Sequence, residues 1–185
     1  MSHARQCHFG RRANRKRIKE TRWRLRGQAH EALESRRLLT TVTWDGGGAD
    51  NNWSTAANWV GDAIPAAGDQ LVFPNAAAQK SNYNDFLAGT SFGSILFDGG
   101  GYTISGNSIV LMGNVTSSAN SNAFDIAVQL GQDGGFTSTS GTFTVDGAID
   151  TNGLQLTLDA ISQLAVAGKI SGAGSTRVSG SGDVV

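Results

Sequence analysis

One pattern occurs twice in the chain, in residues 141–153, which read Gly-Thr-Phe-Thr-Val-Asp-Gly-Ala-Ile-Asp-Thr-Asn-Gly, and in residues 162–174, which read Ser-Gln-Leu-Ala-Val-Ala-Gly-Lys-Ile-Ser-Gly-Ala-Gly. A shift of 21 positions aligns the apolar and glycine positions of the two stretches: Phe143 with Leu164, Val145 with Val166, Gly147 with Gly168, Ile149 with Ile170 and Gly153 with Gly174. Parts of the pattern recur earlier in the chain, from Ile109 to Val115 and from Tyr102 to Gly106. Repetition at a fixed spacing indicates an architecture of stacked repeats.

Apolar residues two positions apart lie on the same face of an extended strand, so each repeat is a set of short strands. A unit of about 20 residues cannot bury its own apolar face, whereas several stacked units bury a continuous core. The sequence therefore predicts an all-β fold, a parallel β-helix of six or seven coils. A β-sandwich is the alternative, because its short strands also alternate apolar and polar residues.

Charge divides the chain into two parts. Residues 1–40 contain twelve of the fifteen basic residues and only three acids, while residues 41–185 contain three basic residues and twelve aspartates. The single cysteine, Cys7, lies in the basic part, so no disulfide can form within the chain. No apolar run has the length of a membrane span. We expect a basic leader in residues 1–43 and a β-helix domain in residues 44–185.

The leader carries a weak helical stripe of apolar residues, so we expect it to be partly helical or disordered. Its arginines would suit a nucleic-acid-binding arm, a helix on an anionic membrane, a targeting segment or a solvated tail. Residues 31–40, Glu-Ala-Leu-Glu-Ser-Arg-Arg-Leu-Leu-Thr, resemble the segment that closes the Arg-rich leader of many planctomycete surface and secreted proteins. That segment usually has proline where Ser35 stands and serine where Thr40 stands. The resemblance implies export, and hence an extracellular or cell-surface location.

Three tryptophans lie close together at the start of the body, in residues 44–75: Trp44, Trp53 and Trp59. The first coil of a solenoid has an apolar end that bulky aromatic side chains can cover, so the favoured interpretation of this stretch is a cap. The alternative is carbohydrate binding, in which the indole faces of these three tryptophans stack on sugar rings beside Asp and Asn side chains.

The same stretch, with residues 101–107 and 166–174, resembles proteins that carry autotransporter-associated β-strand repeats. The resemblance covers most of residues 44–182 and implies a right-handed parallel β-helix that serves as a surface-exposed passenger. Residues 76–91 show little periodicity and are expected to form a protruding loop, and residues 92–185 are expected to form stacked coils. The last residues begin a strand without a polar cap, which predicts an incomplete stack or end-to-end self-association.

The body lacks histidine, cysteine and glutamate, which excludes from it a Ser-His-Asp triad and a zinc site built on His or Cys. Asp146, Asp150 and Lys169 are the nearest candidates for a glycosidase or lyase site, but a solvated outer face is the favoured interpretation of these three residues. Residues 45–50 contain aspartates and glycines but not the tandem repeat of calcium-binding β-helices. We predict no catalytic residues, no metal and no cofactor.

Together these features predict a non-enzymatic, secreted or cell-surface protein of structural or adhesion type. Its expected partners are surface glycans or components of the cell envelope. One alternative is a β-helix that binds or cleaves carbohydrate through the three tryptophans. A second alternative is nucleic-acid binding through the basic leader, which the acidic body disfavours because it would repel the same phosphates.

Overall fold

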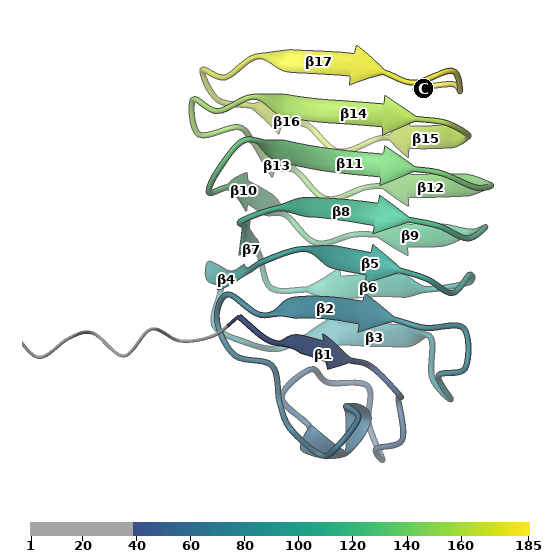
Figure 1. Cartoon of the computed structure of the whole chain (residues 1–185). Coiled ribbons are helices and arrows are strands. Elements are labelled where there is room, and N and C mark those ends of the chain that lie inside the picture. The colour runs from purple at the N-terminus through teal and green to yellow at the C-terminus, as the bar shows by residue number, and fades with distance from the viewer. Residues whose placement is uncertain (1–38) are drawn as a thin grey trace, which may run out of the picture. The chain divides into compact units, whose positions relative to one another are not determined.

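The computed structural model describes residues 39–185, which belong to one compact unit, Arg37–Val185 (Figure 1). The predictions made for residues 1–38 lie outside these described residues. Within them the chain forms short strands and one 3-10 helix: β1 (Thr41–Thr43), η1 (Ala56–Asn58), β2 (Gln70–Phe73), β3 (Ser81–Asn84), β4 (Thr90–Phe92), β5 (Ile95–Phe97), β6 (Thr103–Gly106), β7 (Ile109–Leu111), β8 (Asn114–Ser117), β9 (Asn122–Phe124), β10 (Val128–Leu130), β11 (Gly134–Ser138), β12 (Thr142–Val145), β13 (Ile149–Asp150), β14 (Leu156–Ala160), β15 (Gln163–Val166), β16 (Ile170–Ser171) and β17 (Thr176–Ser179).

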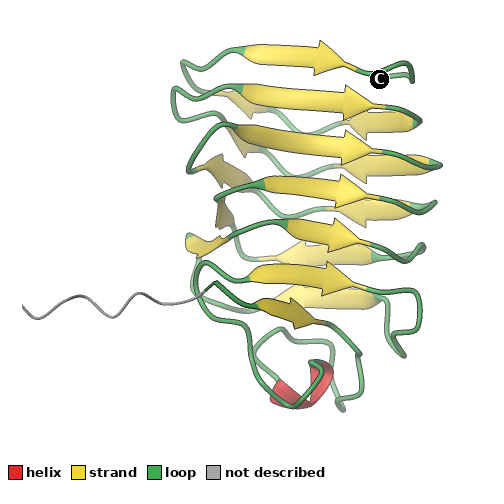
Figure 2. Ribbon diagram, viewed as in Figure 1, coloured by secondary structure: helices red, strands yellow, loops and turns green. Residues whose placement is uncertain are grey.

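The strands form three parallel sheets that are the three faces of a solenoid (Figure 2). One sheet has the order β1-β2-β5-β8-β11-β14-β17, the second β3-β6-β9-β12-β15, and the third β4-β7-β10-β13-β16. Each set of three consecutive strands from β2 to β16 makes one turn. The described residues thus contain five complete turns, fewer than the six or seven expected. The predicted parallel β-helix is confirmed.

The solenoid is right-handed. In Figure 1 the strands of the seven-stranded sheet run from left to right at the front, the fainter strands behind them run back, and the chain climbs with every turn. This is the hand that connections between parallel strands adopt almost without exception, because the strands themselves have a right-handed twist.

Successive turns pair in the register that the repeated pattern predicts. In the pairing of β12 with β15, Phe143 lies opposite Leu164 and Val145 lies opposite Val166. Ile149 of β13 lies opposite Ile170 of β16. The 21-residue shift found in the sequence is therefore the length of one turn at this part of the solenoid.

The inward side chains form one continuous core along the axis. Aromatic rings from different turns contact one another: the centroids of Phe73 and Phe97 are 5.4 Å apart, and those of Phe97 and Phe143 are 5.7 Å apart. The fully buried residues come from all three sheets and include Leu71, Phe92, Ile104, Leu111, Phe124, Leu130, Phe136, Val145, Ile149, Leu156 and Leu164. Burial of this apolar surface is the main favourable term in folding, and each turn contributes to it.

Residues 76–91, expected to form a protruding loop, instead contain β3 and the start of β4. The inward positions of β3 are asparagines, so the apolar alternation that marks a strand is missing there. Asn82 accepts a hydrogen bond from the indole N–H of Trp53 (2.8 Å), and the amide of Asn84 donates to the carbonyl of Asn107 (2.7 Å). At the other boundary, β1 lies inside the predicted leader and pairs with β2.

The glycine of the repeated pattern marks a close approach of backbones. A Cβ atom added to Gly147 would lie 1.9 Å from the carbonyl oxygen of Ile126, and one added to Gly168 would lie 2.0 Å from that of Gly147. Neither glycine has a positive φ. The repeat therefore requires glycine here for space rather than for backbone conformation.

We predict that Gly147→Ala lowers the free energy of unfolding by about 3 kcal/mol or more, because the backbone of the neighbouring turn must shift. Gly153 has a φ of +80° and no atom within 4 Å of an added Cβ, so Gly153→Ala is the matched control, with an expected cost of about 1 kcal/mol from backbone strain alone. Urea unfolding of both variants measures the difference. Equal losses would contradict a packing role for Gly147.

Candidate functional site

Trp44, Trp53 and Trp59 lie in the interior at the N-terminal end of the solenoid. All three are fully buried. Trp44 and Trp59 pack edge to face with ring centroids 5.1 Å apart, and Trp53 packs against Phe73 at 5.9 Å. This geometry contributes beyond simple burial, because the positive edge of one ring faces the negative face of the next.

Each of the three indole N–H groups donates to an acceptor inside the protein. Trp44 donates to the carbonyl of Gln79, Trp53 to the side chain of Asn82 and Trp59 to the carbonyl of Trp53, each at 2.8 Å. A sugar ring stacks only on an exposed indole face, so the prediction of carbohydrate contact at these tryptophans is wrong. Their positions match the interpretation as a cap that covers the first apolar turn.

A polar network holds the loop that carries the cap. The amide of the buried Asn58 donates to the carbonyls of Asp50 (3.1 Å) and Asn52 (3.0 Å), and its oxygen accepts from the backbone N–H of Gly48 (2.8 Å). The Asp50 carboxylate accepts from the Thr55 hydroxyl and from the backbone N–H of Asn52, which lowers its pKa. The carboxylate of Asp50 is therefore engaged in hydrogen bonds that hold the loop. Residues 39–185 contain no group of three or more His, Cys, Asp or Glu arranged to hold a metal ion.

We predict that tryptophan fluorescence of a Trp23→Phe variant, which removes the indole outside the described residues, is weakly quenched by iodide in the folded protein. The three remaining indoles are fully buried and have no face in contact with solvent. The urea-unfolded protein supplies the control, in which iodide quenches strongly. Strong quenching of the folded variant would instead place at least one indole face in solvent.

The structure separates Asp146 from Asp150. Asp146 directly follows β12 and aligns with Asp125 of the previous turn, whereas Asp150 lies in β13, in a different sheet. Burial, followed by the charge of Asp146 and a hydrogen bond with it, raises the pKa of Asp125. Asp125 was not among the residues considered from the sequence. The signal was present, because Asp125 and Asp146 each follow an apolar residue, Phe124 and Val145, at the same position of consecutive repeats.

We predict that Asp125→Asn is more stable than the wild type at pH 7 and that this advantage shrinks as the pH falls toward about 4. A carboxyl group whose pKa is raised on folding destabilises the folded state while it is ionised, and protonation removes this cost. Urea midpoints across this pH range measure the effect. The exposed Asp98 provides the control, and the same pH-dependent difference for Asp98→Asn would contradict a specific pairing with Asp146.

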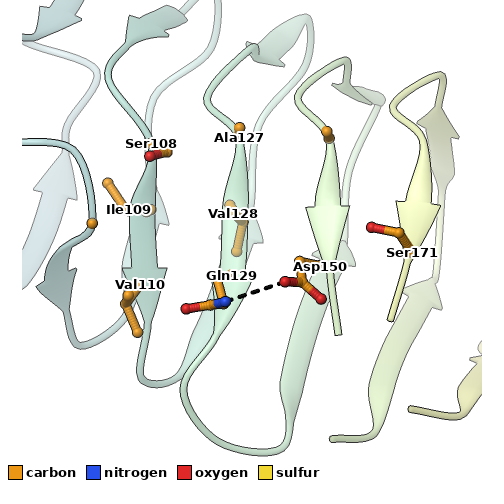
Figure 3. Close-up of a pocket in the computed structure, with 10 residues that line it drawn as sticks. Ser108, Ile109, Val110, Ala127, Val128, Gln129, Asp150 and Ser171 are labelled. Carbon is orange, nitrogen blue, oxygen red and sulfur yellow. Dashed lines mark hydrogen bonds between the residues drawn. The ribbon is translucent and has the colours of Figure 1, made fainter. Parts of the chain in front are cut away.

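The outer face of the third sheet carries a groove that runs across the strands. It has a volume of about 290 Å³ (Figure 3). Its lining includes two parallel rows of residues on successive turns. The first row has short side chains and comprises Gly89, Ser108, Ala127 and Ala148. The second row comprises Val110, Gln129, Asp150 and Ser171. The second row is in register through the pairs of β7 with β10, β10 with β13, and β13 with β16.

Two side chains in this groove are held in place. The amide of Gln129 donates to Asp150 (3.1 Å), and the backbone N–H of Asn152 donates to the same carboxylate (2.9 Å). The hydrogen bond from Asn152, then that from Gln129, lowers the pKa of Asp150, so it is a carboxylate at neutral pH. Lys169, the other residue considered from the sequence, follows Ala148 at the next position of the short row, by the register of β13 with β16.

No family model, curated protein or solved structure matches this chain. Among the described residues, no helix is both long enough and apolar enough to cross a membrane. The chain is a parallel β-solenoid, and the features of this solenoid are the basis for the function proposed below.

Proposed function

We propose that this protein is a non-enzymatic β-solenoid of structural and adhesion type that is secreted or held at the cell surface. The observation that carries the proposal is the single apolar core shared by five stacked turns. Such a core holds the three outer faces in fixed register, so they form long, regular surfaces suited to contact with other molecules.

The outer side chains support a contact surface rather than a reaction centre. In-register columns contain mainly small or neutral residues, for example Leu96, Thr116 and Thr137 on the seven-stranded sheet, which Asp159 and Ser179 continue. The carboxyl groups of Asp125 and Asp146 lie at equivalent positions of consecutive turns, where the charge of Asp146 disfavours ionisation of Asp125. Asp150 lies in a different sheet.

Export is supported by the sequence. The strongly basic residues 1–40 precede the acidic body, and residues 31–40 resemble the end of an export leader. The body has no cysteine, so the stability of the solenoid does not depend on the redox state of its surroundings. Surface glycans and envelope components are the proposed partners.

Self-association through the last turn belongs to the same proposal. Val178 of β17 is 60 % exposed, whereas Leu158, opposite it on β14, is 4 % exposed.

We predict that protease treatment of intact native cells releases peptides from residues 41–185, and that the mature protein begins near Thr40. An exposed solenoid is accessible to the protease at its turns, and a processed leader would be absent from the mature protein. Mass spectrometry of the released peptides and of the mature N-terminus provides the measurement. A cytoplasmic protein monitored in parallel controls for lysis. Protection of the body until lysis, with the original N-terminus intact, would overturn the surface assignment.

A further inference from the structure

The groove on the third sheet has a floor and a wall of different chemistry. Its floor comprises the short side chains at Ser108, Ala127 and Ala148, with the apolar Val110 beside them. Its wall presents the amide of Gln129 and the carboxylate of Asp150 (Figure 3). An apolar floor beside a few fixed polar groups is the usual composition of a site for small molecules and sugars.

The wall presents mainly hydrogen-bond acceptors. The Asp150 carboxylate only accepts hydrogen bonds, and the amide of Gln129 uses one of its two N–H donors on it, which leaves one N–H and the carbonyl oxygen of Gln129 for a ligand. The hydroxyl groups of Ser108 and Ser171 can donate or accept. A ligand with several hydroxyl groups satisfies all of these side chains and can lay its C–H surface on the alanines.

Charge disfavours anionic ligands. Asp150 is ionised in the wall, and the body as a whole carries twelve aspartates against three basic residues. Lys169 lies at the next position of the short row, one turn beyond Ala148, and is not among the residues that line the groove. Nucleic acids and uronate polymers would be repelled by this surface.

The direction of the groove indicates a linear ligand. The rows run from turn to turn, along the solenoid axis, and the turns repeat at roughly 4.8 Å, the spacing of paired strands. This spacing is close to the length of one sugar ring, so successive rings of a linear glycan would meet equivalent positions on successive turns. An extended peptide fits less well, because β7, β10 and β13 beneath the groove are already paired on both sides and offer it no free edge.

We propose that this groove binds a linear, uncharged, hydroxyl-rich glycan whose chain lies across β7, β10, β13 and β16. Asp150 and Gln129 anchor its hydroxyl groups, and Ala127 and Ala148 support its apolar face. The proposal names a ligand for the adhesion role described above and rests on that role for its biological setting. Binding in solution does not depend on where the protein is located.

Affinity gel electrophoresis of the full chain in hydroxyethyl cellulose, glucomannan or xylan tests the proposal, with polygalacturonate as the anionic comparison. We expect at least one neutral polymer to retard the protein and polygalacturonate to have no effect. Ala148→Phe fills the floor of the groove and should abolish retardation. Asp150→Ala removes a charged hydrogen-bond partner and should weaken binding by about ten-fold or more.

The matched control is Ala123→Phe, which places the same bulk on the outer face of β9, in the second sheet, and should bind like the wild type. Urea unfolding establishes that each variant is folded, and if Ala148→Phe is not, Asp150→Ala alone decides. Absence of retardation by every neutral polymer, equal retardation by polygalacturonate, or wild-type binding by the folded groove variants would overturn the proposal. If the protein is exposed on cells but fails these assays, the glycan proposal is wrong and the proposed surface location stands.

Discussion

The structure depends on the in-register stacking of successive turns. Every internal strand pairs with the equivalent strand of the turns on either side, so the backbone hydrogen bonds and the core are both built by repetition. This constraint fixes the residue types at each position. Inward positions carry apolar side chains that contact one another along the axis, and Gly147 and Gly168 recur where the turns come too close for a side chain. Outward residues align in columns.

The two ends of the described solenoid differ in how their apolar side chains are covered. At the N-terminal end, the first apolar turn would face solvent, and three buried tryptophans packed around Phe73 cover it. Each of their indole N–H groups donates to an acceptor within the protein. At the last described turn, Val178 is exposed where its counterpart one turn earlier is buried. The tryptophans therefore stabilise the fold, and the lateral faces are where contact with other molecules can occur.

Register also explains how a solenoid with so few charged side chains can form a site. Short residues at equivalent positions of consecutive turns produce a hollow that continues along the axis, and longer residues beside them produce its wall. The Gln129–Asp150 contact joins two neighbouring turns and orients both side chains toward the groove (Figure 3). A site of this kind has the periodicity of the sheet, and this periodicity is the basis for proposing a polymer as its ligand.

The repeat alone favoured the parallel β-helix over a β-sandwich and indicated the register of its last turns, because stacked turns require apolar residues and glycines at a fixed spacing. It did not reveal β3, whose inward positions are asparagines that hydrogen-bond to residues far along the chain, among them Trp53 and Asn107. It also left the tryptophans open to two interpretations, since burial depends on what packs against a ring. The groove was equally hidden, because its short residues from Gly89 to Ala148 are separated by 19, 19 and 21 positions and align only when loops of unequal length are folded. Local pattern specifies the strand and its inward face, whereas contacts between distant turns decide which outer residues become neighbours.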